Sequence, residues 1–232
     1  MKLQITRQDI YSRGELLLRS IFGFIYIMLP HMFLLAFVGI WSAILTFISF
    51  WVVLFTGKYP QSFYEFQVKF RAWWLRVQAT FMNLVDGYPS FGLNGTSEKV
   101  NLSVEYPQSL SRGLVLVRLF FGVFYVGLPH GFCMIFRMIA TQILTFLAWW
   151  VVLFTGKYPE SWHDFNVGTL RWMTRLQLYN GFMTDEYPPF SGKELEPAQQ
   201  GPVNMPPPAP QQPVNPAPPA SDAGQTPGGA QK

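Results

Sequence analysis

Residues 44–60 read ILTFISFWVVLFTGKYP, and residues 143–159 read ILTFLAWWVVLFTGKYP. The two segments are identical at 14 of 17 positions and lie at a constant offset of 99 residues. The same offset aligns further motifs without a gap: Ser12-Arg13-Gly14, Leu29-Pro30-His31, Arg76, Asp86 and Tyr88-Pro89 with their counterparts in the second half. Such a register is typical of internal duplication. We therefore predict two copies of one unit, at residues 1–92 and 99–192.

The composition indicates a membrane protein. Half of the 232 residues are hydrophobic and only 13% are charged, whereas soluble proteins carry about 25% charged residues. Residues 21–55 contain no charge at all. The net charge of +4 is spread without a dense Lys/Arg run, which favours a membrane surface as partner over nucleic acid. The single cysteine, Cys133, excludes an intramolecular disulfide framework and a Cys-rich zinc site.

The length of the apolar segments predicts helical hairpins. A straight helix over residues 21–55 would be about 52 Å long, while the hydrocarbon core of a bilayer is about 30 Å thick. We therefore predict two short spans in each copy. They are expected at about 20–38 and 41–56, and at about 114–136 and 140–155, with tips at Gly39–Ser42 and near Arg137.

The hairpins predict a topology. With two spans per copy, nearly all Lys and Arg side chains fall on one side, which the positive-inside rule assigns to the cytoplasm. Both termini are then cytoplasmic. The chain is expected to be a multi-pass protein of the inner (cytoplasmic) membrane, without a cleavable signal peptide.

A terminator follows each copy's second apolar segment. Thr56-Gly57-Lys58-Tyr59-Pro60 recurs unchanged at residues 155–159. Glycine permits a left-handed cap, proline prevents continuation of the helix, and we expect the tyrosine at headgroup level. Lys58 and Lys157 are candidate lipid-headgroup contacts.

Amphipathic helices are predicted at about 61–85 and 160–184, where apolar residues recur at helical spacing among charged ones. A basic, Trp-bearing helix of this kind is typical of a membrane interface. Its arginines are therefore further candidate headgroup contacts: Arg71, Arg76, Arg171 and Arg175. The alternative is that these helices pack on the protein's own core.

Short strands are predicted before the apolar segments of each copy, and a disordered tail is predicted after the second copy. Residues 99–105 alternate apolar and polar side chains, and residues 2–5 do so less cleanly, so we expect short strands that pair the two copies. Residues 193–232 are rich in Pro, Ala, Gln and Gly. That composition predicts a disordered tail, and its run at 206–210 is a candidate docking segment for a protein partner.

The Leu-Pro-His elements are the candidate polar site. A proline in a span frees a backbone carbonyl, which a neighbouring polar side chain can satisfy. His31 and His130 lie about halfway along their predicted spans, and an ionisable residue at that depth is a functional hypothesis. One interpretation brings the two imidazoles together near the axis that relates the copies, as metal or haem ligands or a proton relay. The other gives each imidazole a local carbonyl partner. No third ligand supports a metal site.

Each copy resembles the bacterial domain of unknown function 4389. The shared features are Ser-Arg-Gly, Leu-Pro-His, the Trp-Val-Val-Leu-Phe-Thr-Gly-Lys-Tyr-Pro segment, Phe-x5-Arg-Trp and the closing Asp-x-Tyr-Pro. Copy one departs at Ala72, where copy two has Arg171, and at Ser90. The resemblance implies a bacterial integral membrane protein and implies no activity.

No enzyme signature is present. The sequence has no Gly-rich phosphate loop, nucleophile elbow or His-Glu-x-x-His pattern. We expect an all-α, non-enzymatic membrane scaffold or accessory subunit with no cofactor, which contacts lipid and a membrane or cytoplasmic protein. The alternatives are a small transporter or lipid-handling protein with a groove between the copies, and a redox or haem protein.

Overall fold

The fold consists of two long helical paths, two shorter helices and a two-stranded ribbon. Each long path is an α-helix, a π-helical segment and a second α-helix in succession. The structure is a computed structural model, and it describes residues 1–194. The first copy contains β1 (Lys2–Ile5), α1 (Arg13–Gly23), a π-helical segment η1 (Phe24–Met28), α2 (Leu29–Thr56) and α3 (Gln61–Phe81). The second contains β2 (Val100–Ser103), α4 (Arg112–Gly122), η2 (Val123–Gly127), α5 (Leu128–Thr155) and α6 (Glu160–Asn180). The two copies thus repeat the same order of elements. The tail predicted at 193–232 lies almost wholly outside the described residues.

The predicted hairpins are wrong. The spans expected at 20–38 and 41–56, and at 114–136 and 140–155, are parts of two helical paths of 44 residues, Arg13–Thr56 and Arg112–Thr155, which do not turn back at the expected tips. Gly39–Ser42 lies inside α2 and Arg137 inside α5. No residue near these positions forbids a helix, since Gly39 costs only about 1 kcal/mol relative to Ala there. Both paths are long and apolar enough to cross a membrane, by length and composition only.

The break in helical geometry comes earlier, at the proline. Pro30 and Pro129 stand at the second residue of α2 and α5, directly after η1 and η2. A proline lacks the N–H that would bond the carbonyl four residues before it, and its ring clashes with that carbonyl. Widening the turn into a π-helical segment relieves the clash.

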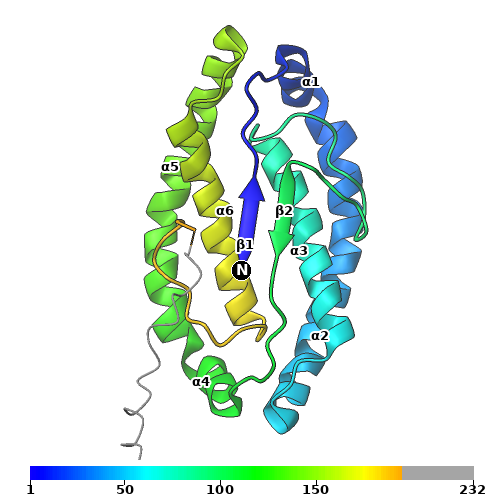
Figure 1. Cartoon of the computed structure of the whole chain (residues 1–232), viewed down its shortest axis with the longest axis vertical. Helices are drawn as coiled ribbons and strands as arrows, with labels where there is room; N and C mark the ends of the chain where they lie inside the picture. Colours follow the sequence, from blue (N-terminus) through cyan, green and yellow to red (C-terminus); the bar gives the residue numbers. More distant parts are fainter. Residues whose placement is uncertain (195–232) are drawn as a thin grey trace, which may run out of the picture. The chain divides into compact units, whose positions relative to one another are not determined.

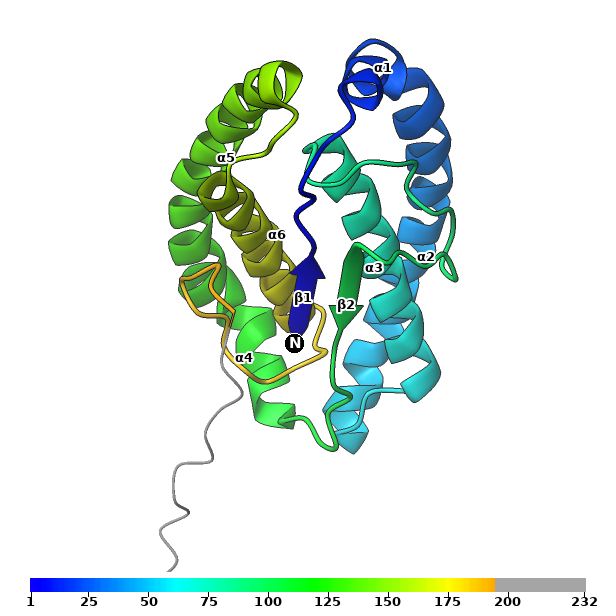
Figure 2. The same cartoon turned by 45° about the horizontal axis from the view of Figure 1, so that its top comes forward.

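The strands pair the two copies about a pseudo-twofold axis. β1 and β2 are antiparallel, as expected of the short strands, and Leu3 lies opposite its own equivalent, Leu102. The axis therefore passes through this pair, perpendicular to the ribbon. As a result α2 and α5 run in opposite directions, and the ribbon lies over α3 and α6 (Figures 1 and 2).

The terminators join the copies. Gly57 and Gly156 both adopt φ 72° in the left-handed region, as the cap prediction requires. Their carbonyls accept backbone hydrogen bonds of 2.8 Å from the other copy, Gly57 from Leu110 and Gly156 from Tyr11. Tyr59 and its equivalent Tyr158 are each 1% exposed, so both side chains pack inside the protein rather than on its surface. The cores are shared as well: one cluster combines Leu3 and Leu16 with residues of α5 and α6.

Candidate functional site

The two candidate histidines lie in separate aromatic cages. His31 and His130 are 0% and 1% exposed. Each Nδ1 accepts a hydrogen bond from an indole N–H of the neighbouring helix, Trp73 at 2.9 Å and Trp172 at 3.1 Å. Each imidazole also packs on a phenylalanine of its own copy, Phe91 or Phe190. The structure therefore does not bring the two imidazoles together, and the local partner is an indole rather than a carbonyl. In residues 1–194 no three His, Cys, Asp or Glu side chains gather as metal ligands.

The closing Tyr-Pro motif satisfies the carbonyl that the proline frees. Tyr88 donates its hydroxyl hydrogen to the carbonyl of Tyr26 at 3.2 Å, four residues before Pro30. In the second copy, Tyr187 donates to the carbonyl of Tyr125 at 2.9 Å. This confirms the prediction that a polar side chain meets the freed carbonyl. The Leu-Pro-His and Tyr-Pro motifs are thus two halves of one structural lock.

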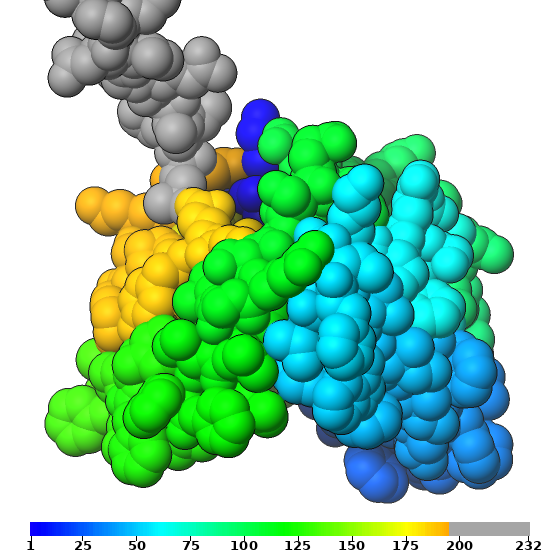
Figure 3. All heavy atoms as spheres, turned by 90° about the horizontal axis from the view of Figure 1, so that it is seen from below, coloured from blue at the N-terminus to red at the C-terminus, as the bar shows by residue number. Residues whose placement is uncertain are grey.

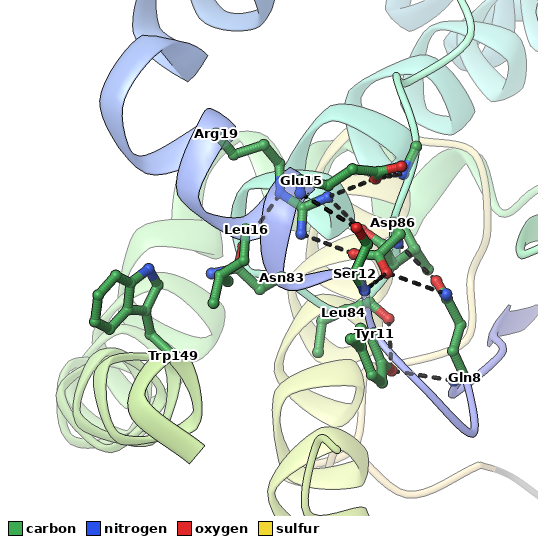
Figure 4. A network of polar contacts seen from close by, with 12 residues as sticks. Gln8, Tyr11, Ser12, Glu15, Leu16, Arg19, Asn83, Leu84, Asp86 and Trp149 are labelled. Carbon is green, nitrogen blue, oxygen red and sulfur yellow. Dashed lines mark hydrogen bonds and ion pairs between the residues drawn. The ribbon is translucent and has the colours of Figure 1, made fainter. Parts of the chain in front are cut away.

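A second lock joins the Ser-Arg-Gly and Asp-x-Tyr-Pro motifs (Figure 4). Arg19 donates to Asp86 at 3.0 Å, and both side chains are under 10% exposed. The other oxygen of Asp86 accepts the backbone N–H of Ser12, the N-cap of α1, at 2.6 Å. Arg118 and Asp185 repeat the pair at 2.8 Å. These residues hold the start of α1 or α4 to the end of the copy.

Among the six candidate headgroup residues, three arginines bond backbone carbonyls of the protein and the two lysines are exposed. Arg76 donates to the carbonyls of Ser90 and Gly92. Arg171 and Arg175 donate to backbone carbonyls in the same way, and they hold the segment at 191–193. Lys58 and Lys157 are exposed at the ends of α2 and α5. Of the six candidates only these two lysines are exposed, and Arg71, like Arg171 and Arg175, has an Nε without a partner.

Arg71 is a buried cation without an acidic partner. Its residue is 9% exposed, and no carboxylate of residues 1–194 lies within 4 Å of it. One Nη atom donates to the carbonyl and side-chain oxygens of Gln67 at 2.9 and 2.8 Å. Its Nε has no partner. Burial lowers the pKa of Arg71 to about 10, so the guanidinium is still charged at neutral pH. A buried charge of this kind is costly unless it is paired.

Arg71 lines one cavity, and that cavity shares a lining residue with a second. The first, about 490 Å³, is lined by Arg71 and by residues of α2, α3 and the end of α6, among them Thr46, Trp74 and Gln177. The second, about 690 Å³, is an apolar crevice between α2 and α4, lined by Phe47, Trp51, Leu116 and others. Thr46 lines both, so the arginine cavity and the apolar crevice share one lining residue.

The second copy fills the equivalent positions. At the offset of 99, Leu170 stands in place of Arg71 and Trp149 in place of Phe50. Where Leu119 of α4 lines the crevice, its equivalent in α1 is Ser20. The indole N–H of Trp149 donates to Ser20 at 2.7 Å across the α1–α5 contact. The arginine and its crevice therefore belong to one side of the pseudo-twofold axis. The sequence signal for this was the mismatch between Arg71 and Leu170 in an otherwise constant register.

An apolar face runs along both long helices. Of the 40 large hydrophobic residues that are exposed, 34 lie in Leu17–Phe55 or Leu116–Phe154. In these two ranges no charged residue is exposed, because Arg19 and Arg118 are buried and Arg137 bonds Thr169 in α6. The exposed residues of α3 are polar instead, including Glu65 and Lys69. The long helices thus carry the exposed apolar surface, and α3 carries exposed polar side chains. Seen from below, α2 and α4–α5 meet along a seam and part where the surface is hollowed (Figure 3).

Comparison with known proteins gives a family and no activity. The model of a family described as domain of unknown function (DUF4389) matches residues 15–92 and again residues 114–192. No curated protein and no solved structure matches the chain. The two matches together cover more than half of the chain and coincide with the two structural copies. The chain therefore belongs to the DUF4389 family, with two tandem copies of its domain.

Proposed function

We propose that this protein is a non-enzymatic membrane scaffold or accessory subunit that lies in one face of a bilayer. The observation that carries the proposal is the apolar face of the two long helices, which is far larger than the few hundred Å² expected of a soluble monomer's largest patch. The repeated motifs support a structural role, since they interlock with one another. We place it in the bacterial inner membrane, with the polar layer in the cytoplasm.

The geometry favours helices that lie in the membrane plane over helices that cross it. A straight path of 44 residues would be about 66 Å long, roughly twice the hydrocarbon thickness. In a crossing orientation α3 would follow α2 into the bilayer, because Gln67 bonds Ser42 midway along α2 at 2.7 Å. The exposed Glu65 and Lys69 would then lie near mid-membrane, at a cost of several kcal/mol. In the planar orientation all exposed charges stay in water.

In the planar orientation, as in the expected hairpins, the basic side chains lie on one side of the membrane. The pseudo-twofold axis would stand along the membrane normal, so the ribbon and both copies of the polar helices face the same side. The termini are then on one side without any crossing. This replaces the multi-pass topology expected from the hairpins.

Flotation with phospholipid vesicles tests membrane seating. Phe37 and its equivalent Phe136 are 59% and 60% exposed. Replacing both by Glu removes about 3 kcal/mol of apolar burial at the least. We therefore expect bound protein to fall about a hundredfold. The control variant Lys69→Gln, on the polar layer, should float like the wild type. Equal flotation of the double variant and the wild type would refute membrane seating.

A scaffold also needs a partner. We assign that contact to the Pro-rich tail, whose docking segment lies outside the described residues. Removal of residues 195–232 should release a protein that co-purifies with the full chain in mild detergent. If the full chain is a monomer without such a protein, the scaffold role is wrong.

A lipid-handling role is the second candidate, and the two adjoining cavities on one side of the axis favour it. They share Thr46 in their lining, and the crevice between α2 and α4 opens on the face that we place in lipid. No comparable observation supports the transporter or redox alternatives.

A further inference from the structure

We propose that Arg71 binds the phosphate of one anionic phospholipid, whose acyl chain lies in the apolar crevice between α2 and α4. This inference rests on the proposed membrane seating and names a ligand for the groove. It assigns the site to one side of the pseudo-twofold axis only.

The first argument is the missing counter-charge. Arg71 is among the residues that line the 490 Å³ cavity, its buried Nε has no partner, and no carboxylate lies within 4 Å among the described residues. Its other contacts are neutral oxygens: Gln67, at 2.8 and 2.9 Å, and the carbonyl of Gln177, at 3.5 Å. A phosphate is the anion that the planar guanidinium binds in a bidentate manner. A bound phosphate would therefore neutralise a charge that the protein itself leaves unpaired.

The second argument is the apolar extension. The crevice of 690 Å³ shares Thr46 with the arginine cavity and is lined elsewhere by apolar side chains, including Phe47, Trp51 and Phe120. A free anion would gain no contact from these apolar side chains. A phospholipid has a charged headgroup next to an apolar chain and could contact both the arginine and the crevice. The crevice opens on the face of the long helices that we place in the membrane, where phospholipid is abundant.

The third argument is the contrast with the second copy. Leu170 replaces the arginine there, and it is 5% exposed in a packed core. The two locks recur in both copies, whereas an arginine at this position occurs in the first copy only. The same contrast supplies the test variant, because Arg71→Leu introduces the residue that the fold already carries at the equivalent position.

The test measures retained lipid. Wild type, Arg71→Leu, Arg71→Lys and the surface control Lys69→Gln are purified as full chains in detergent. Each is mixed with dioleoyl-phosphatidylglycerol or dioleoyl-phosphatidylcholine, and bound lipid is counted by native mass spectrometry. Melting by circular dichroism verifies folding of each variant.

We expect the wild type and Lys69→Gln to retain one phosphatidylglycerol in preference to phosphatidylcholine. In Arg71→Leu that preference should fall about tenfold or more, since a charge-assisted bidentate contact is lost. Arg71→Lys should retain part of it, because the charge remains while the fork geometry does not.

Three results would overturn the proposal. The first is equal retention of phosphatidylglycerol by Arg71→Leu and the wild type. The second is equal retention of the two lipids by the wild type. The third is displacement of the lipid by millimolar inorganic phosphate, which would indicate a free-anion site. Vesicle flotation of Arg71→Leu separates this proposal from membrane seating: normal flotation with lost retention supports the lipid site, whereas failure of the wild type to float refutes the seating on which it rests.

Discussion

The buried lock at Arg19 yields a prediction that depends on burial alone. Two carboxylates contact this arginine. Asp86 lies 3.0 Å away with its side chain 8% exposed, and Glu15 lies 3.7 Å away with its side chain 45% exposed. Removing one partner of a buried ion pair costs about 3–5 kcal/mol, whereas exposed pairs contribute at most about 1 kcal/mol. Asp86→Asn should therefore cost about 3 kcal/mol, the lower end of that range, because Glu15 remains nearby.

Thermal unfolding in detergent measures this difference. For a folded unit of this size, 1 kcal/mol corresponds to about 2–4 °C in Tm. We expect Asp86→Asn to lower Tm by about 6–12 °C and Glu15→Gln by less than about 4 °C. The Asn variant also mismatches the backbone N–H of Ser12 that its second oxygen accepts, which adds to the loss. A larger effect for Glu15→Gln than for Asp86→Asn would refute the burial argument.

Three further predictions concern stability. Gly57→Ala should destabilise more than Gly156→Ala, because both positions have φ 72° but only at the former does a Cβ come within 3.3 Å of a backbone oxygen, that of Leu110; equal losses in Tm would contradict this. Tyr88→Phe removes one hydrogen bond to the carbonyl that the proline frees, so it should cost about 1 kcal/mol, and an unchanged Tm would show that the bond contributes nothing. Burial lowers the pKa of His163, so its unfolded form binds more protons and stability should fall as pH drops below about 6.5; the slope of Tm against pH in this window should be smaller in His163→Gln, and an unchanged slope would disprove the assignment.

The repeat, the strands and the caps were predictable from the sequence because each follows from local chemistry. The offset of 99 is visible by inspection, the alternation at 99–105 is a strand signal, and Gly57 occupies the left-handed cap that only glycine adopts readily. The capping of the proline-freed carbonyl was also predictable in kind. Its donor, Tyr88, comes from 58 positions beyond Pro30, so only the tertiary structure identifies it.

The hairpins failed for a physical reason. The length argument assumed that an apolar helix must stand upright in the bilayer, and no Pro or Gly pair near Gly39 supports a turn. Arg137 was interpreted as a hairpin tip because a lone charge in a span is costly. In the structure it turns towards α6 instead and bonds Thr169 at 2.9 Å. The contact between Arg137 of α5 and Thr169 of α6 cannot be predicted from the sequence of either helix alone.

The arginines show the same limit. Arg71, Arg76 and Arg175 are equally plausible from sequence, since all lie on predicted amphipathic helices. Only the folded structure shows that Arg76 and Arg175 bond carbonyls of the segments that close each copy, whereas Arg71 bonds Gln67 and Gln177 and lines a cavity. The histidines, in turn, are packing elements of their own copies and not a shared pair.

Sidedness of labelling at the two ends of one long helix tests the central claim most directly. In a Cys133→Ser background, single cysteines are placed at Gly14, where a Cβ meets open space apart from Ser12 at 3.9 Å, and at the exposed Lys58. A membrane-impermeant maleimide is then applied to right-side-out and inverted vesicles. Helices in the membrane plane predict that both positions react only in inverted vesicles. Reaction of the two positions from opposite sides would contradict the account.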